Sequence, residues 1–504
     1  MQFRDSPMSF LGARQAARGK RRAARGARHA ARGAEPVAAG RARWPSHLAV
    51  EPCMVRKAIR TGCPDLSSTT IDLAQARSPT SILRWYVLIL TCLIYAINIA
   101  DRYVVSTVLE PIRLELHLND KGVAFLTGTP LALFYVAFGI PISWCADRMN
   151  RRNILAASLI IWSAFTILCG RSRNYLEFLL GRVGVGVGEA GGTPPSTAIV
   201  SDYFPADRRP MAMTVLALGA PIGAYLGADF AGKIAHLYTW RAAFIALGLP
   251  GLVMGVLVYL TVREPVRGRL DGVLDELRPT LRQSLKFLWQ QKAAFHVVVG
   301  GGLCALWGWG LIWWTPTFLQ RAYNLDVGQA GAVTGNIHLI GGSLATIGTA
   351  WILSRPTMAD PRRVVWLLAA GIAFATIPSI IAYWTHSLLV CKLMFWIFIP
   401  AIYFYIGPCF GLLNNLSPCH MRNMFIAISL LVANILNIVV APQAVGALSD
   451  WFAGPGGVDA ASLRAALLIL APSGFWAAYH LWLASRTIIE DQKRAIGYTK
   501  AWSP

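Results

Sequence analysis

Four ionisable residues lie within long apolar stretches of this 504-residue chain. Asp101 and Arg102 are consecutive in one stretch, and Arg182 and Glu189 are seven residues apart in another. Seven residues make nearly two turns of an α-helix, so Arg182 and Glu189 share one helix face. Charged side chains inside a membrane segment are costly and indicate a functional site by default. We expect the two acids and the two arginines to form one neutral, buried network.

This predicted network has two interpretations. It can be a structural ion-pair cluster that locks two helices together. It can also be a switch for a proton or a substrate, because a carboxylate that contacts arginine in only one of two conformations has a different proton affinity in each. In that case Asp101 or Glu189 carries the proton, and Arg102 or Arg182 pairs with an anionic substrate.

The composition indicates a membrane protein. The chain is 55% hydrophobic and only 14% charged, whereas about a quarter of a soluble domain is charged. Twelve apolar segments are each long enough to span a bilayer as a helix. They cover residues 84–109, 122–146, 153–171, 175–200, 211–235, 241–262, 294–318, 329–353, 363–384, 387–412, 421–446 and 462–486. We therefore predict an all-α integral membrane protein with twelve transmembrane helices.

The charge distribution predicts the orientation of these helices. The formal net charge is +22, and residues 1–60 contain 14 Lys and Arg against three Asp and Glu. Basic residues are concentrated in the loops that share a side with both termini, and basic loops stay on the cytoplasmic side. Residues 1–80 are predicted to be a basic, disordered cytoplasmic tail, and residues 491–504 a second cytoplasmic tail. The longer tail can be a solvated segment, an arm that binds anionic lipid or nucleic acid, or an overextended gene start.

One long connection divides the chain into two similar parts. Residues 266–290 are predicted to be a cytoplasmic linker between six-helix bundles at 81–265 and 291–490. Pro111, Asp120 and Gly128 in the first part correspond to Pro316, Asp326 and Gly335 in the second. Two similar halves that run in the same direction are typical of a parallel repeat about the membrane normal.

A short basic loop lies between the second and third apolar segments. Its residues 143–152 resemble the loop signature of the major facilitator superfamily, Gly-x-x-x-Asp-Arg-x-Gly-Arg-Arg. Asp147, Arg148, Arg151 and Arg152 match this pattern, and Ser143 stands where the family has glycine. The resemblance implies a cytoplasmic gate, with Asp147 and Arg148 as a latch. The alternative is that the loop only sets the topology.

A narrower resemblance is to the spinster-like transporters of that superfamily. It rests on residues 98–103 (Asn-Ile-Ala-Asp-Arg-Tyr), 181–190, 201–205 and 241–244, and is weaker in the second half. The resemblance implies proton-linked or facilitated movement of lipid-like or amphipathic organic molecules. It also implies that Asp101, Arg102 and Glu189 lie at a central cavity.

The second half is rich in aromatic rather than charged residues. These residues can form an interfacial belt or line a cavity for an apolar substrate. The candidate cavity residues, chosen from both halves, are Asn98, Trp307, Asn336, His338, Tyr403, Asn434 and Asn437. The nine cysteines are scattered singly and indicate no zinc site or disulfide framework. We predict no metal and no cofactor.

These features together predict a secondary transporter and not an enzyme. The expected cargo is a small amphipathic or lipid-like molecule or organic anion, moved by alternating access with a proton as the coupling ion. A facilitative uniporter or exchanger remains an alternative, as does a non-transporting membrane sensor. We expect a monomer in the plasma or inner membrane, in contact with lipid and not with nucleic acid.

Overall fold

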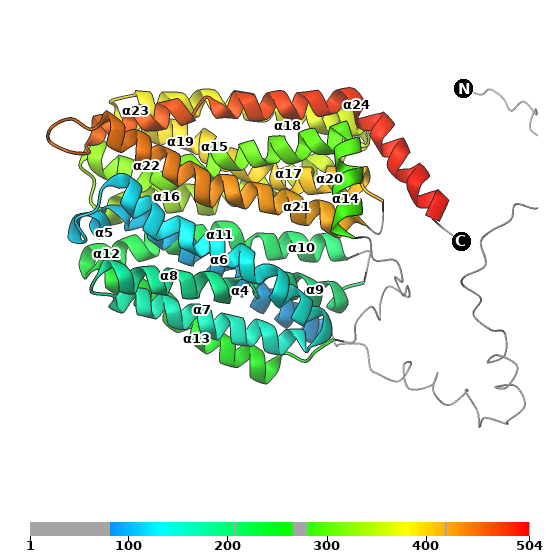
Figure 1. The fold of residues 1–504 in the computed structure, drawn as a ribbon, viewed down its shortest axis with the longest axis horizontal. Helices are drawn as coiled ribbons and strands as arrows, with labels where there is room; N and C mark the ends of the chain where they lie inside the picture. Colours follow the sequence, from blue (N-terminus) through cyan, green and yellow to red (C-terminus); the bar gives the residue numbers. More distant parts are fainter. Residues whose placement is uncertain (1–80, 206–207, 266–279, 419–420, 503–504) are drawn as a thin grey trace, which may run out of the picture. The chain divides into compact units, whose positions relative to one another are not determined.

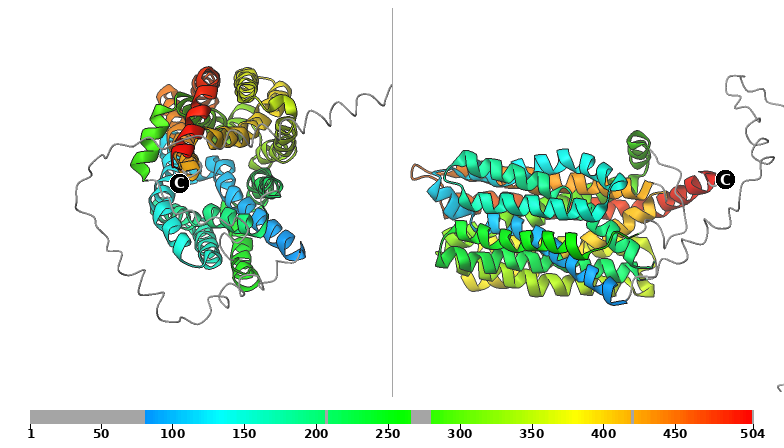
Figure 2. Two further views of the ribbon diagram at one scale, coloured as in Figure 1. Left: turned by 90° about the vertical axis from the view of Figure 1, so that its right-hand side faces the viewer. Right: turned by 90° about the horizontal axis from the view of Figure 1, so that it is seen from below.

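The computed structural model describes residues 81–205, 208–265, 280–418 and 421–502, and the predicted tail 1–80 lies outside the described residues. The described part is built from helices (Figure 1). Most of them run side by side with roughly parallel axes, as the end-on view in Figure 2 shows. One short helix, α14 (Leu281–Gln290), lies across the ends of the others, on the side where the chain ends.

All twelve predicted membrane segments are helical. They are α4 (Ser81–Thr107), α6 (Asp120–Arg148), α7 (Arg151–Arg171), α8 (Tyr175–Glu189) with α9 (Thr193–Tyr203), α10 (Arg209–Ala217) with α11 (Gly219–Tyr225) and α12 (Ala231–Leu237), α13 (Trp240–Thr261), α15 (Lys292–Tyr323), α16 (Val327–Asn336) with α17 (Ser343–Leu353), α18 (Pro361–Trp384), α19 (Leu388–Phe404) with α20 (Ile406–Leu416), α21 (Arg422–Asn434) with α22 (Ala441–Phe452), and α23 (Ala460–Leu470) with α24 (Ser473–Trp502). A short helix, α5 (Leu109–Glu115), follows α4.

Eleven of these segments, among the described residues, are long and apolar enough to cross a membrane. The remaining one is interrupted between α8 and α9, where Gly192 precedes Thr193 and two prolines. Proline lacks a backbone N–H and disfavours continuation of a helix through it, so the sequence itself accounts for this break. Two elements differ from the predicted boundaries. Residues 281–290 of the predicted linker form α14, and α24 continues as a helix to Trp502.

Short polar residues at the loops set where several helices begin. The side chains of Asn119, Asn150 and Asn174 accept hydrogen bonds from backbone N–H groups in the first turns of α6, α7 and α8. Asp326 and Asp459 do the same for α16 and α23, each with a reciprocal capping bond. Such caps satisfy N–H groups that have no partner within the helix.

Three membrane segments contain π-helical turns near their middles. These turns are η1 (Leu226–Phe230) between α11 and α12, η2 (Ile337–Gly342) between α16 and α17, and η5 (Ile435–Val440) between α21 and α22. The segments α11–η1–α12 and α16–η2–α17 lie against each other, and η5 lies against α6. The wider turns are therefore located where the first and second halves of the chain meet. Such turns occur frequently at functional sites.

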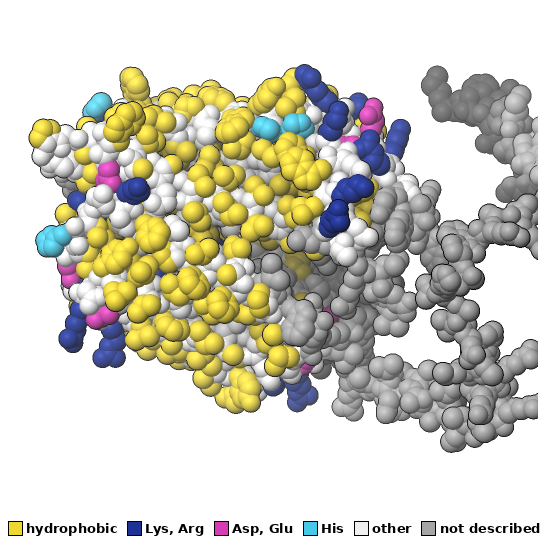
Figure 3. Space-filling view, viewed as in Figure 1, with side chains coloured by type: hydrophobic (Ala, Val, Ile, Leu, Met, Phe, Trp, Pro, Cys, Tyr) yellow, Lys and Arg dark blue, Asp and Glu magenta, His cyan; other side chains and the backbone are white. Residues whose placement is uncertain are grey.

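Small residues allow these contacts to be close. A Cβ at Gly128 of α6 would lie 2.8 Å from the carbonyl oxygen of Ile438, and one at Gly331 would lie 2.3 Å from that of Ala228. The outside of the helices is covered with hydrophobic side chains (Figure 3). This apolar surface, together with the spans, shows a multi-pass membrane protein.

Candidate transport site

The structure brings the four buried charged residues together as two crossed ion pairs. Asp101 of α4 lies 3.4 Å from the guanidinium of Arg182 in α8 and accepts a 2.6 Å hydrogen bond from the hydroxyl of Thr166. Arg102, the next residue of α4, donates two hydrogen bonds of 3.1 and 2.8 Å to one oxygen of Glu189 in α8. Adjacent residues of one helix thus pair with two residues that share a face of another, as the seven-residue spacing predicts.

Burial makes these pairs sensitive to the loss of either partner. Asp101 is 2% exposed, and Arg182 and Glu189 are fully buried. Removing one partner of a buried pair leaves an uncompensated charge, which costs several kcal/mol. Among the described residues, the second carboxylate oxygen of Glu189 has no hydrogen-bond partner. The Glu189 carboxylate therefore depends on Arg102, whose side chain is 20% exposed.

Arg102 opens onto a cavity of ≈ 240 Å³ that is lined from both halves of the chain. Aromatic side chains make up much of its wall. The lining includes Tyr95, Tyr103, Trp309, Trp313, Tyr405, Asn434 and Asn437. A second, more apolar cavity of ≈ 450 Å³ shares Tyr95, Ala220, Ile406 and Phe410 with the first. Because both cavities are lined by these four residues, the cavities lie next to each other, with the shared side chains between them.

Four of the predicted cavity residues line these spaces. Asn434 and Asn437 face the first cavity, and Asn98 and Tyr403 face the second. His338 is fully buried beside them, with its Nδ1 atom 2.9 Å from the hydroxyl of Tyr403.

The other two predicted cavity residues lie away from both of these spaces. Trp307 is fully buried, donates a hydrogen bond to Ser379 and packs edge-on against Phe398. Asn336 is exposed and donates to the carbonyl of Ala332, one turn earlier in its own helix. Neither residue lines either of the two cavities.

The spacing of the tryptophans along α15 indicates which of them share a helix face. Trp309 and Trp313 are four residues apart and both line the first cavity. Trp307 and Trp314 are seven residues apart, on the other face, and both are fully buried. The i, i+4 and i, i+7 spacings define these two faces. The concentration of aromatic residues is evident from the sequence, but the helix face that lines the cavity was not predicted from it.

At one end of the helices, the basic loop makes contacts within the first half of the chain. The guanidinium of Arg151 lies 2.7 Å from Asp202 and 2.9 Å from Glu264. Glu264 also accepts a 2.9 Å hydrogen bond from the backbone N–H of Arg152. Asp147 and Arg148 form the last turn of α6, but their side chains lie outside the described residues, and so does the predicted latch.

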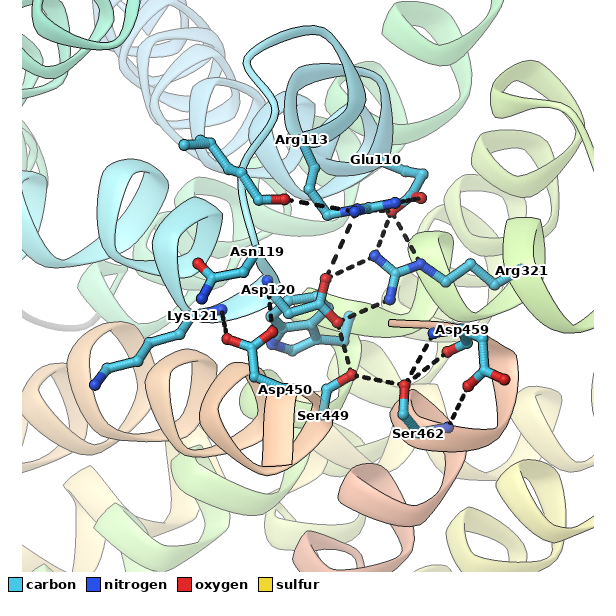
Figure 4. Close-up of polar contacts among 12 residues, drawn as sticks. Glu110, Arg113, Asn119, Asp120, Lys121, Arg321, Ser449, Asp450, Asp459 and Ser462 are labelled. Atoms are coloured by element: carbon cyan, nitrogen blue, oxygen red, sulfur yellow. Dashed lines mark hydrogen bonds and ion pairs between the residues drawn. The ribbon is translucent and has the colours of Figure 1, made fainter. Parts of the chain in front are cut away.

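At the opposite end, a network of charged residues joins the two halves (Figure 4). Arg321 of α15 lies 2.5 Å from Glu110 in α5 and 2.7 Å from Asp120 at the start of α6. Arg113 also pairs with Glu110, at 2.7 Å. Burial alone opposes ionisation of Glu110, but the hydrogen bonds from Arg113 and Arg321 outweigh it and hold the pKa of Glu110 below its ordinary value.

Two residues of α22 complete this network. The Ser449 hydroxyl donates to Asp120 at 2.7 Å. The Asp450 carboxylate accepts the backbone N–H groups of Asp120 and Lys121 at 2.9 and 3.0 Å, so one half of the chain caps a helix of the other. The roles of Arg321 and Asp450 were not predicted from the sequence. Both residues lie near helix ends, where charged residues are common and do not by themselves indicate a function. Their partners are about 200 and 330 residues away.

Within the described residues, no three His, Cys, Asp or Glu side chains gather in a way that could hold a metal ion. A multi-pass helical protein with buried charges beside a cavity between its halves has the construction of a membrane transporter.

The comparisons with known proteins agree with this class. The model of the Major Facilitator Superfamily matches residues 91–442, and the chain belongs to this family. It is a transporter-class protein and not an enzyme.

Relatives and a solved structure match different shares of the chain. An MFS-type efflux pump of Mycolicibacterium smegmatis is 28% identical over 418 residues, which cover 81% of this chain and 95% of the pump. Protein spinster of Drosophila melanogaster is 26% identical over 55% of this chain and 48% of its own. A crystal structure of a bacterial homologue of the human lysosomal transporter spinster, in an inward-facing and unoccupied conformation, matches with 27% identity and a TM-score of 0.71. It covers 84% of this chain and all of that one. The predicted resemblance to spinster-like transporters is confirmed.

Proposed function

We propose that this protein is a proton-coupled secondary transporter that moves a small amphipathic organic molecule by alternating access. One observation carries the proposal: two buried carboxylates are each held by an arginine, and both arginines line a cavity formed by the two halves. An ion pair with only a structural role does not need to reach a cavity, whereas the side chain of Arg102 lines one.

The crossed pairs provide a route for coupling. When Glu189 takes up a proton, its charge-assisted hydrogen bonds with Arg102 weaken, and the guanidinium becomes free to turn into the cavity. An anionic group of the substrate can then pair with it. Asp101 and Arg182 form a second ion pair between the same two helices, nearly two turns away along α8. Protonation, substrate binding and the ion pairs between α4 and α8 are thereby linked.

The two adjoining cavities favour an amphipathic cargo. The first offers Arg102 and two asparagines, and the second is lined mainly by apolar side chains. A polar head group fits the first and an apolar portion fits the second. One relative supports this class of molecule: a sphingosine-1-phosphate transporter of Danio rerio is 32% identical over 53% of this chain and 56% of its own.

We further propose that the structure represents the inward-facing state, with both termini cytoplasmic in a plasma or inner membrane. The ion network around Arg321 holds together the ends of the helices that we assign to the outside. The bacterial homologue with TM-score 0.71 was solved in an inward-facing conformation. On this assignment the bundles 81–265 and 291–490 rock about the central cavity, and the monomer is the working unit.

Proton flux into proteoliposomes tests the proposal. Purified full-length protein is reconstituted around an internal pH dye, and lysophospholipids, sphingoid bases and aromatic acids are added in turn. Substrate-dependent acidification is expected, and it should vanish in Asp101→Asn or Glu189→Gln. Glu177→Gln is the matched control, since Glu177 is an exposed acid of the same helix, α8. Labelled substrate that equilibrates without proton movement would instead identify a facilitative uniporter or exchanger. Absence of transport for every compound, with an output lost on deletion of residues 1–53, would identify a sensor.

A further inference from the structure

A pair of histidines that the transport mechanism does not use lies in the groove between α15 and α24. The Nδ1 atoms of His296 and His480 are 3.1 Å apart, and their ring centroids are 5.2 Å apart. Both side chains are partly exposed on the outside of the helices. Figure 3 shows two neighbouring histidine side chains beside α24, with Lys and Arg side chains gathered toward the end of that helix. The two Nδ1 atoms are hydrogen-bond partners of each other, so only the Nε2 sides of the rings are available to a ligand.

Aromatic side chains of α14, α15 and α24 lie near this pair. Trp289 of α14 stacks on Phe295 with ring centroids 5.1 Å apart. On α24, Tyr479 stacks on Trp482 at 5.9 Å, and Trp476 lies 6.0 Å from His480. Tryptophan and tyrosine concentrate at the level of lipid head groups, where one end of the ring is apolar and the other is hydrated. The groove is therefore located at a membrane interface.

Two basic residues lie at the same level. The guanidinium of Arg486 is 4.2 Å from the ring centroid of Trp482. Gly300 packs against Leu481, so the turn of α24 that carries Arg486 lies beside the turn of α15 that carries His296. Lys292 is exposed and precedes His296 by four residues, which places both on one face of α15. Two acids lie nearby. Asp491 caps the start of α15 and pairs with Arg494, and Glu490 is exposed one turn after Arg486. Within the described residues, neither forms an ion pair with Lys292 or Arg486.

We propose that this groove binds the phosphate-bearing head group of an anionic phospholipid. Lys292 and Arg486 supply the charge. Because one Nδ1 atom donates to the other, the histidine whose Nδ1 atom accepts carries its hydrogen on Nε2, and this N–H group donates to the phosphate. The acyl chains lie along the exposed rings of Trp476 and Tyr479, which are 56% and 54% exposed. A soluble phosphate would use the cations but leave these rings uncovered, which favours the lipid.

Native mass spectrometry of the full-length protein in a neutral detergent tests the site. Phosphatidylglycerol and phosphatidylcholine with identical acyl chains are titrated separately, and inorganic phosphate is used as a competitor. Phosphatidylglycerol should bind more tightly than phosphatidylcholine. In the double variant Lys292→Gln/Arg486→Gln its affinity should fall roughly 30-fold, which is about 2 kcal/mol for two surface cations. Both residues are exposed or lie over a ring, so the variant should remain folded, and its elution in size-exclusion chromatography checks this.

Arg355→Gln is the matched control, because Arg355 also lies over a tryptophan, Trp351, at 3.7 Å, but on another part of the surface. Its affinity for phosphatidylglycerol should stay near that of the unmodified protein. For the unmodified protein, raising the salt concentration should weaken phosphatidylglycerol binding, which provides a test that needs no variant. Equal affinity for the two lipids, an unchanged double variant, or complete displacement by millimolar phosphate would overturn the assignment to a lipid.

Discussion

Replacing Arg321 with methionine should open the end of the protein that the Arg321 network closes. Arg321 is 7% exposed and contacts two carboxylates, Glu110 and Asp120, which are themselves 11% and 0% exposed. Without the guanidinium, these acids remain buried close together in the closed state and are hydrated only when the halves separate. The penalty therefore falls mainly on the closed state.

The size of the effect follows from this geometry. Removal of one partner from a buried ion pair costs about 3–5 kcal/mol. If only 3 kcal/mol of this acts on the closed state, the ratio of closed to open molecules falls by more than about 100-fold. A transporter that is mostly closed on this side would become mostly open. Arg113, which pairs with Glu110 from the same half, cannot restore the connection between the halves.

Distances between two spin labels measure this opening. Labels at exposed loop positions 173 and 456, one in each half, are introduced after the native cysteines have been replaced. Arg321→Met should shift the distance distribution to longer values. Arg241→Met is the control, because Arg241 forms a 2.6 Å pair with Glu115 inside the first half and should leave the distribution unchanged. An unaltered distribution in Arg321→Met would refute the claim that this network holds the end closed.

Three further predictions concern the same network and the helix packing. The pKa of Glu110 is lowered in the closed state, so ionised Glu110 stabilises that state. This contribution should be complete above about pH 4.5 and should be lost as the pH falls through the lowered pKa. Spin-label distances should therefore lengthen in acid. Asp450→Ala removes a cap on α6 and should destabilise the closed state by about 0.5–2 kcal/mol, read from the same distance distributions; an effect as large as that of Arg321→Met would contradict this account. Gly188→Ala places a Cβ 2.6 Å from the backbone nitrogen of Trp162 and should lower thermal stability in detergent by about 1–3 kcal/mol, whereas Gly497→Ala, where nothing lies within 4 Å, should have little effect.

The sequence alone determined the membrane helices and indicated a charged network within the first half. Apolar segment length is a local property, because every backbone group in a bilayer must be satisfied within its own helix. That Arg182 and Glu189 share a face follows from helix periodicity, and the expectation that Asp101 and Arg102 join them follows from the need to neutralise charge in lipid. Which acid pairs with which arginine was decided by the tertiary structure. Most of the fold was therefore readable from composition and spacing.

The tertiary structure decided which face of each helix meets the cavity and which residues join the halves. Trp307 and Trp309 are both aromatic and lie in one helix, yet only the packing of α15 against α24 and α19 shows that Trp307 is enclosed and that Trp309 lines the cavity. Arg321, Glu110 and Asp450 come from segments far apart in the chain, and no local pattern specifies such pairs. Their contacts depend on how whole helices are placed, and this is the physical reason that a sequence without a structure leaves them undetermined.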